Sequence, residues 1–213
     1  MITIHHLGVS QSERIIWLCE ELDLPYELKA YTRDANTRMA PPTLRDVHPL
    51  GSAPVISDGE QVLAESGAIV EYVLERYGNG RLRPATAAPE YADYLYWLHY
   101  ANGTLMPSLM LDFVIGMPSA NNAAHPMAAL FGARLQRNLL WVENRLGQVK
   151  FVAGAEFTAA DILMHFPFGT MRAFAPMDLS QRPNTKAWLG RISERPAYQK
   201  AMRIAGHARD PAG

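Results

Sequence analysis

The sequence of 213 residues contains a single cysteine, Cys19, which excludes an internal disulfide framework. With no CxxC pattern and no cluster of cysteine and histidine, the chain also has no zinc-binding pattern, so we expect no metal. Among the seven histidines, His5, His6, His48 and His99 are scattered without ligand spacing. We expect each to be a surface or hydrogen-bonded residue rather than a catalyst.

Long apolar runs and an excess of either charge are also missing. No stretch is long enough to span a bilayer, and the opening MITIHHLGVS lacks the basic and apolar regions of a secretory signal. Twenty basic residues face twenty-one acidic ones, so no global field favours nucleic acid or an anionic membrane. We therefore expect a cytoplasmic protein with a small-molecule ligand, and neither a nucleic acid nor a membrane as partner.

The hydrophobic residues that are present, 48% of the chain, predict a folded protein, and its length favours two modest domains. Residues 2–4 and 26–30 alternate as strands on either side of a helical stripe, which predicts a strand, helix, strand unit with parallel strands. The Asp58-Gly59 pair then indicates a hairpin, and residues 69–77 have helical periodicity. This order predicts an α/β domain with a mixed four-stranded sheet.

Strand patterns nearly vanish after a linker that contains two prolines. We therefore predict a first domain over residues 1–78, a linker over 79–89 and an all-helical domain over 90–213. The expected helices cover residues 90–114, 126–147, 159–173 and 184–205, with a break near Pro196. Thr158 and Asp161 have capping-box spacing at the start of the third of them.

The segment Glu65-Ser66-Gly67 joins a strand to a helix. If Ser66 caps this helix, its hydroxyl and the free backbone N–H groups favour a carboxylate, whereas Glu65 favours an ammonium. Together they suit an amino-acid head group. The alternative is a simple helix cap beside a solvated glutamate.

Two further segments have a structural and a functional interpretation. Base rates favour a trans Ala53-Pro54 bond, but a cis bond would turn the Ala53 backbone outward to pair with an extended peptide. Ser10 and Glu13 have capping-box spacing before the first helix. A hydroxyl at this helix N-terminus could also donate to a ligand thiolate and lower the pKa of that thiol.

The segments SQSERIIWLCEELDLPYE, HPLGSAPVI, LAESGAIVEYVLERYG and FTAADI resemble, in order and spacing, a cytosolic-type glutathione S-transferase of the serine type, similar to bacterial theta or nu classes. The resemblance covers nearly the whole chain. It implies a thioredoxin-like domain followed by an all-helical bundle, with glutathione as cosubstrate. It also implies a homodimer in which the first domain of one subunit meets the second domain of the other.

The resemblance assigns roles to the three segments above. It implies a cis Pro54, pairing of the Ala53 backbone with the cysteinyl part of glutathione, and binding of the γ-glutamyl group by Glu65 and Ser66. Ser10 would be the catalytic residue that stabilises the thiolate, with Ser12 as its rival.

The chain departs from the family pattern at the position of the glycine carboxylate of glutathione. His48 and Ser52 stand at the glutathione-binding positions where related enzymes often have asparagine and lysine. His48, Arg38 or Arg45 could supply the missing positive charge, and no spacing selects among them.

The resemblance places the electrophile between the domains, against Val9 and the run YLYWLHYANGTLMPSLM. Tyr100 and Met106 are the expected pocket residues of this run, although helical spacing is equally typical of a core.

The expected reaction is attack of the glutathione thiolate on an electrophilic carbon, or on a peroxide oxygen as a side activity. The alternatives are a non-catalytic glutathione-binding or regulatory protein, and a glutathione-dependent disulfide reductase. The reductase would need a reactive Cys19, which we expect to be a buried core residue.

Overall fold

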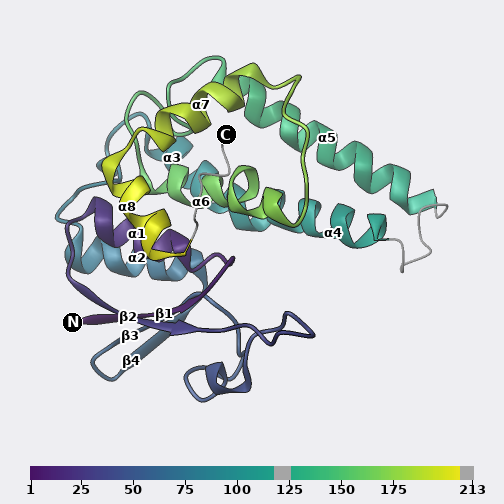
Figure 1. Ribbon diagram of the computed structural model, residues 1–213. Coiled ribbons are helices and arrows are strands. Elements are labelled where there is room, and N and C mark those ends of the chain that lie inside the picture. The colour runs from purple at the N-terminus through teal and green to yellow at the C-terminus, as the bar shows by residue number, and fades with distance from the viewer. Residues whose placement is uncertain (118–125, 207–213) are drawn as a thin grey trace. The chain divides into compact units, whose positions relative to one another are not determined.

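The computed structural model describes residues 1–117 and 126–206, which divide into two compact units (Figure 1). The first unit contains residues 1–83 together with the chain from Arg191 onward, and the second contains residues 84–190. Among the described helices, none is long and apolar enough to cross a membrane. The grouping of the last helix with the first unit differs from the division expected from the sequence.

The first unit is built on a four-stranded sheet in the order β2-β1-β3-β4. Its strands are β1 (Ile2–Leu7), β2 (Tyr26–Tyr31), β3 (Val55–Asp58) and β4 (Gln61–Ala64). β1 and β2 are parallel and are joined by α1 (Glu13–Glu21), whereas β3 runs antiparallel to both of its neighbours. The mixed sheet of a thioredoxin-like domain is thereby confirmed.

The register of the sheet brings several chain segments to one end of it. His5 in β1 lies opposite Val55 at the start of β3, and Val55 lies opposite Ala64 at the end of β4. Leu7 at the end of β1 lies beside Tyr31 at the end of β2. The segments that follow β1, β2 and β4 and the segment that precedes β3 therefore all leave the sheet at the same end.

Helices α1 and α2 (Ser66–Tyr77) lie on one face of this sheet, and α8 (Pro196–Ile204) packs beside α1 (Figure 1). Trp17 of α1 meets Tyr198 of α8 edge to face, with ring centroids 5.0 Å apart. Apolar side chains of the strands and helices form the core between the layers. Its members include Ile4, Ile15, Leu18, Val55, Ile56, Val70 and Val73, all less than 1% exposed.

Both helix starts differ from those expected. Helix α1 begins at Glu13 with Ser12 as its N-cap, so the Ser10–Glu13 capping box does not form. The Ser10 hydroxyl instead accepts the Ser12 backbone N–H at 3.3 Å. Helix α2 begins at Ser66 itself, and the N-cap is Glu65, whose φ of 71° lies in the left-handed region.

The second unit is helical, as predicted. Helix α3 (Tyr91–Tyr100) continues through a π-helical turn (Ala101–Leu105) into α4 (Met106–Gly116). Then come α5 (Pro126–Leu146), α6 (Ala159–Phe168), a 3-10 turn (Thr170–Ala173) and α7 (Pro183–Ser193). The predicted capping box of Thr158 and Asp161 at the start of α6 is present. The core contains Trp97, Val142, Leu163, Phe168 and Trp188, each no more than 1% exposed.

Candidate functional site

The loop between β1 and α1 is held by Arg33, which follows β2 at the same end of the sheet. The guanidinium of Arg33 donates from Nε to the Gly8 carbonyl at 2.9 Å and from Nη2 to the Val9 carbonyl at 3.0 Å. Val9 has a φ of 52°, an unfavourable conformation for a β-branched residue. Helix α1 begins four residues after Val9, at Glu13, so the loop is held at both of its ends.

Ser10 and Ser12 form a connected pair at the N-terminus of α1. Their hydroxyl oxygens lie 2.8 Å apart, and the Ser12 oxygen lies 2.8 Å from Nδ1 of His6. Ser12 is fully buried, whereas Ser10 keeps 9% of its surface exposed. The first turn of α1 has the positive end of the helix dipole, which favours an anion next to Ser10.

His6 and Arg33 are the residues of this site that the sequence analysis did not identify. His6 continues the face of β1 that contains Ile2 and Ile4, and all three side chains are buried. A histidine on an apolar strand face was therefore the available signal. Nothing in the sequence pattern reveals that Arg33 reaches the loop after β1, because that contact depends on the parallel pairing of β1 and β2.

The segment before β3 presents a free backbone at the same end of the sheet. The Ala53–Pro54 peptide bond is cis, as the resemblance implied. Among the described residues, neither the N–H nor the carbonyl of Ala53 has a hydrogen-bond partner. Both groups can therefore bind an extended peptide.

At the start of α2, Glu65 is exposed and Ser66 is 3% exposed. Neither side chain has a hydrogen-bond partner within the part of the chain that the structure describes. Because Ser66 is the first helical residue, its hydroxyl lies beside the free N–H groups of the first turn. The Glu65 carboxylate, which can accept hydrogen bonds from an ammonium, therefore lies next to the Ser66 hydroxyl and the N–H groups, which can donate to a carboxylate.

His48 and Ser52 lie in the segment between the 3-10 turn Pro42–Leu44 and β3. Nδ1 of His48 accepts the backbone N–H of Leu50 at 3.4 Å, and Ser52 is exposed. Gly51 has a φ of 59°, and a Cβ added there would meet Cγ of Arg45 at 2.6 Å. The Arg45 side chain therefore packs over Gly51, next to Ser52, whereas Arg38 belongs to the turn after β2.

Cys19 is fully buried in the face of α1 that packs on the core. Burial, together with the nearby charge of Glu20, raises the pKa of the Cys19 thiol to about 12. A buried thiol that stays protonated does not take part in thiol-disulfide exchange. Cys19 therefore does not provide the reactive cysteine that a glutathione-dependent disulfide reductase would need.

Of the three residues expected to contact the electrophile, two are buried in the second unit. Tyr100 and Met106 are each 7% exposed, and the Tyr100 hydroxyl donates to the Asn138 carbonyl at 3.2 Å. Neither is among the residues that line the cavity between α4 and α5. Val9 belongs to the loop after β1 and is partly exposed.

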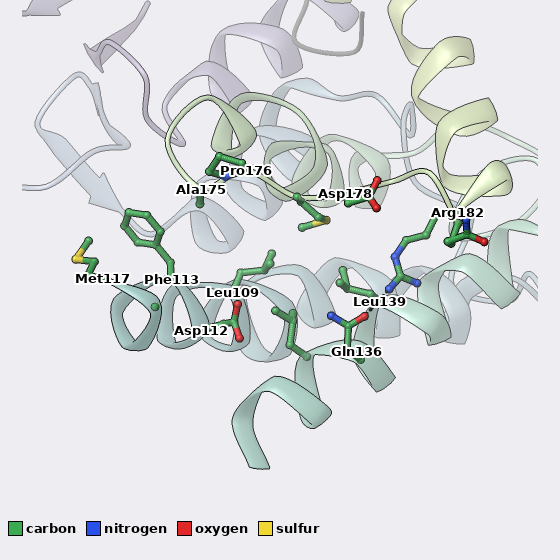
Figure 2. Close-up of a pocket in the computed structure, with 14 residues that line it drawn as sticks. Leu109, Asp112, Phe113, Met117, Gln136, Leu139, Ala175, Pro176, Asp178 and Arg182 are labelled. Atoms are coloured by element: carbon green, nitrogen blue, oxygen red, sulfur yellow. Dashed lines mark hydrogen bonds between the residues drawn. The ribbon is translucent and has the colours of Figure 1, made fainter. Parts of the chain in front are cut away.

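The second unit contains a cavity of about 580 Å³ between α4, α5 and the segment that precedes α7 (Figure 2). Its apolar lining includes Leu109 and Phe113 of α4, Leu139 of α5 and Pro176 of the segment before α7. At one end, the Arg182 guanidinium donates to Oε1 of Gln136 at 2.8 Å (Figure 2). The cavity is large enough for a small organic molecule. The sequence analysis did not predict it, because the residues that line it come from three separate segments of the chain.

Acidic, histidine and cysteine side chains do not gather into a metal-binding group anywhere in residues 1–117 and 126–206. The arrangement at the end of the sheet consists instead of hydroxyls, free backbone groups and one exposed carboxylate. Such groups bind and orient an amino-acid or peptide ligand.

Two family models match the chain. The glutathione S-transferase N-terminal domain matches residues 5–81, and the glutathione S-transferase C-terminal domain matches residues 106–196. Glutathione S-transferase 3 of Schizosaccharomyces pombe is 34% identical over 221 aligned positions, which cover 94% of this chain and 86% of the relative.

Solved structures give the same result. A glutathione S-transferase of Actinobacillus pleuropneumoniae superposes with a TM-score of 0.87 at 35% identity, over 97% of this chain and 93% of the other. A theta class enzyme of Xanthomonas axonopodis pv. citri, solved with glutathione bound, superposes with a TM-score of 0.73 at 28% identity, over 94% and 96% of the two chains.

Proposed function

The chain belongs to the glutathione S-transferase family, and on this premise we propose that it is a serine-type transferase that binds glutathione at the end of the sheet. In this proposal Ser10 stabilises the thiolate of glutathione, which then attacks an electrophilic carbon of the second substrate. No covalent intermediate with the enzyme forms. The observation that carries the proposal is the convergence of the Ser10, Ala53 and Glu65 segments at one sheet end.

The dimensions of the sheet suit this ligand. The segments belong to β1, β3 and β4, so they span two strand spacings, or about 10 Å. A tripeptide in extended conformation covers roughly 10 Å as well. Glu65 and Ser66 would bind the γ-glutamyl group, the free backbone groups of Ala53 would pair with the cysteinyl residue, and the thiol would lie at Ser10. Arg45 would supply the positive charge that binds the glycine carboxylate, and His48 and Ser52 of the same segment would contact this carboxylate as well.

Between the two serines, the hydrogen bonds favour Ser10 as the residue that contacts the thiolate. The Ser12 hydroxyl is fully buried and already lies within hydrogen-bond distance of His6 and Leu7. Ser10 has exposed surface and stands ahead of the helix start. Its O–H can donate to a thiolate, whereas the helix dipole adds a smaller favourable field.

The proposal is tested by the ultraviolet absorbance of the thiolate of bound glutathione, titrated against pH. We expect the thiol pKa to be lowered in the wild type and to return toward its ordinary value in Ser10→Ala. Because one donor to the developing anion is lost, kcat should fall about 100-fold. S-methylglutathione, which has no thiol, should bind both proteins equally. An unshifted thiol pKa in the wild-type complex would instead identify a non-catalytic glutathione-binding protein.

A peroxide side activity follows from the same thiolate, because a peroxide oxygen is also an electrophile. Organic hydroperoxides assayed with glutathione, in the wild type and in Ser10→Ala, would establish whether the thiolate accepts them. Loss of both activities in the variant would assign them to one site.

We also propose that the protein forms a two-fold homodimer. Three large apolar side chains of α3 and α5 are about half exposed, Tyr96 at 48%, Leu140 at 52% and Trp141 at 51%. A second copy of the chain would cover these side chains and remove their apolar surface from water. Sedimentation should show a dimer at micromolar concentration and a weakened one in Trp141→Glu. A monomer in the wild type would contradict the proposal.

A further inference from the structure

Ser10 is the outer member of a buried hydrogen-bonded chain that continues through Ser12 to His6. The two hydroxyl oxygens are 2.8 Å apart, and the Ser12 oxygen is 2.8 Å from Nδ1 of His6. Nε2 of His6 faces the carbonyl oxygen of Ala205 at 3.2 Å. His6 is 4% exposed and Ser12 is fully buried, so the inner part of this chain is shielded from water.

The direction of each hydrogen in this chain follows from its partners. A carbonyl oxygen only accepts, so Nε2 of His6 has the hydrogen that donates to Ala205. In the neutral ring Nδ1 is then an acceptor, and the Ser12 hydroxyl donates to it. The Ser12 oxygen can in turn accept from the Leu7 N–H and from the Ser10 hydroxyl, at 3.2 and 2.8 Å. With neutral His6, the hydrogens of both hydroxyls therefore point inward.

We propose that His6 is the proton acceptor for the glutathione thiol, reached through the hydroxyls of Ser10 and Ser12. This inference rests on the proposed contact of Ser10 with that thiol. The thiol proton moves to the Ser10 oxygen, the Ser10 proton to the Ser12 oxygen, and the Ser12 proton to Nδ1 of His6. The products are a thiolate and an imidazolium, so charge and protons balance without any other reactant.

The protonated state also satisfies its hydrogen bonds. The imidazolium donates from Nδ1 to Ser12 and from Nε2 to Ala205, and the Ser12 hydroxyl can donate to the Leu7 carbonyl at 3.3 Å. The Ser12 oxygen then accepts from His6 and from the Leu7 N–H, which leaves no place for the Ser10 hydrogen. The Ser10 hydroxyl is therefore available to donate outward to the thiolate.

Helix α8 contributes to the stability of the imidazolium. Ala205 is the C-cap residue of α8, so its carbonyl lies at the negative end of the helix dipole. This end favours a cation at Nε2 of His6. Because His6 acts through two hydroxyls and does not contact the thiol, it is a positioning residue with a proton-accepting role.

The wild-type protein provides the first test. NMR of labelled histidine nitrogens, at neutral pH, should show His6 neutral in the free protein and doubly protonated in the glutathione complex. With S-methylglutathione, which has no thiol proton, His6 should stay neutral. In parallel, a pH indicator in weakly buffered solution should detect no proton release while the ultraviolet absorbance reports the thiolate.

The variant His6→Gln gives the second test, because its amide cannot accept a proton. We expect kcat to fall roughly 100-fold with the KM for glutathione nearly unchanged. Any thiolate that still forms should release its proton to solvent. The matched control is His5→Gln, since His5 precedes His6 on β1 but bonds Tyr31 and Ser57 instead. This control should behave as the wild type.

The outcomes separate this inference from the function on which it rests. A thiolate that forms in the wild type with release of one proton and with neutral His6 would overturn the relay but leave Ser10 activation intact. An unionised thiol in the wild-type complex would overturn both. If His6→Gln fails to fold, the comparison of glutathione with S-methylglutathione on the wild type still decides.

Discussion

Glu21, the last residue of α1, accepts two hydrogen bonds from the guanidinium of Arg195, at 2.7 and 2.6 Å, across a separation of 174 residues. Such bidentate pairs are stronger and more directional than single hydrogen bonds. The Glu21 side chain is only 7% exposed, and the pair holds the start of α8 against α1. Since α8 ends at the carbonyl that contacts His6, this ion pair also supports the inner end of the proposed relay.

The first prediction concerns this ion pair. We expect Arg195→Ala to lower the free energy of unfolding by about 2 kcal/mol, because a buried carboxylate loses charged donors. Arg195→Lys should retain only part of the stability that Arg195→Ala loses, since a lysine cannot form the bidentate contact. The matched control is Lys200→Ala. Lys200 pairs with Glu20 and is more exposed than Arg195, so its loss should lower the free energy of unfolding by less than about 1 kcal/mol. Urea unfolding measures all three, and equal losses would contradict the assignment.

The second prediction concerns Cys19. Because burial raises the pKa of its thiol to about 12, iodoacetamide should not modify it in the folded protein at neutral pH. After denaturation in urea, mass spectrometry should show one alkylated cysteine per chain. Rapid modification of the folded protein would restore the disulfide reductase as a candidate function.

The sequence predicted the fold well because local patterns determine most of it. Alternation over residues 2–4, the stripe that contains Cys19 and the Asp58-Gly59 turn each identify an element. These local signals also identified the Thr158–Asp161 capping box, which the structure contains. The helix starts at Glu13 and Ser66 were each misjudged because hydrogen bonds of the folded loop decide them.

The contacts within the candidate site could be predicted much less well. Local patterns singled out Ser10, Ala53 and Glu65, and the resemblance assigned their roles, but their convergence depends on strand order and register. The chain from Ser10 to His6 was missed, since His6 was expected to be an ordinary hydrogen-bonded residue. The Ala205 carbonyl also contacts His6, and it lies nearly two hundred residues later in the sequence, so the packing of α8 beside α1 is needed to bring the two together.

The third prediction concerns the pH dependence of stability. Asp161 is fully buried and accepts hydrogen bonds at 3.0 Å from the Val152 N–H, the Thr158 N–H and the Trp188 ring N–H. Burial raises its pKa from 3.8 to about 6, although these hydrogen bonds act in the opposite direction. Between these values the unfolded chain loses the proton while the folded chain keeps it. Stability should therefore fall as pH rises from about 4 to about 6.

The size of this effect is about 3 kcal/mol, from roughly two pKa units at 1.36 kcal/mol each. The neutral variant Asp161→Asn does not titrate, so it separates this residue from the other carboxylates. We expect the free energy of unfolding of the wild type to fall by about two thirds of that amount, about 2 kcal/mol, relative to the variant between pH 4 and pH 6. A difference that stays constant over this range would show that Asp161 has an ordinary pKa in the folded protein.

The last prediction concerns Arg33, which we expect to position Ser10 through the loop after β1. Its guanidinium bonds the carbonyls of Gly8 and Val9, and its Nη1 donates to the Arg38 carbonyl at 2.9 Å. The left-handed conformation of Val9 costs about 1 to 3 kcal/mol, which the loop must recover from such contacts. In Arg33→Ala we expect the loop to relax, the pKa of bound glutathione to rise and kcat to fall about tenfold, because small displacements of a reacting group cost rate.

Two variants make this result specific. Arg83→Ala removes a partly exposed arginine of the same unit that pairs with Glu75, and it should leave the thiol pKa unchanged. In the double variant Arg33→Ala with Val9→Gly, the glycine adopts the left-handed conformation without strain, so part of the lost kcat should return. If Val9→Gly gives no recovery and the thiol pKa does not move in Arg33→Ala, then the Arg33 contacts stabilise the fold without positioning Ser10.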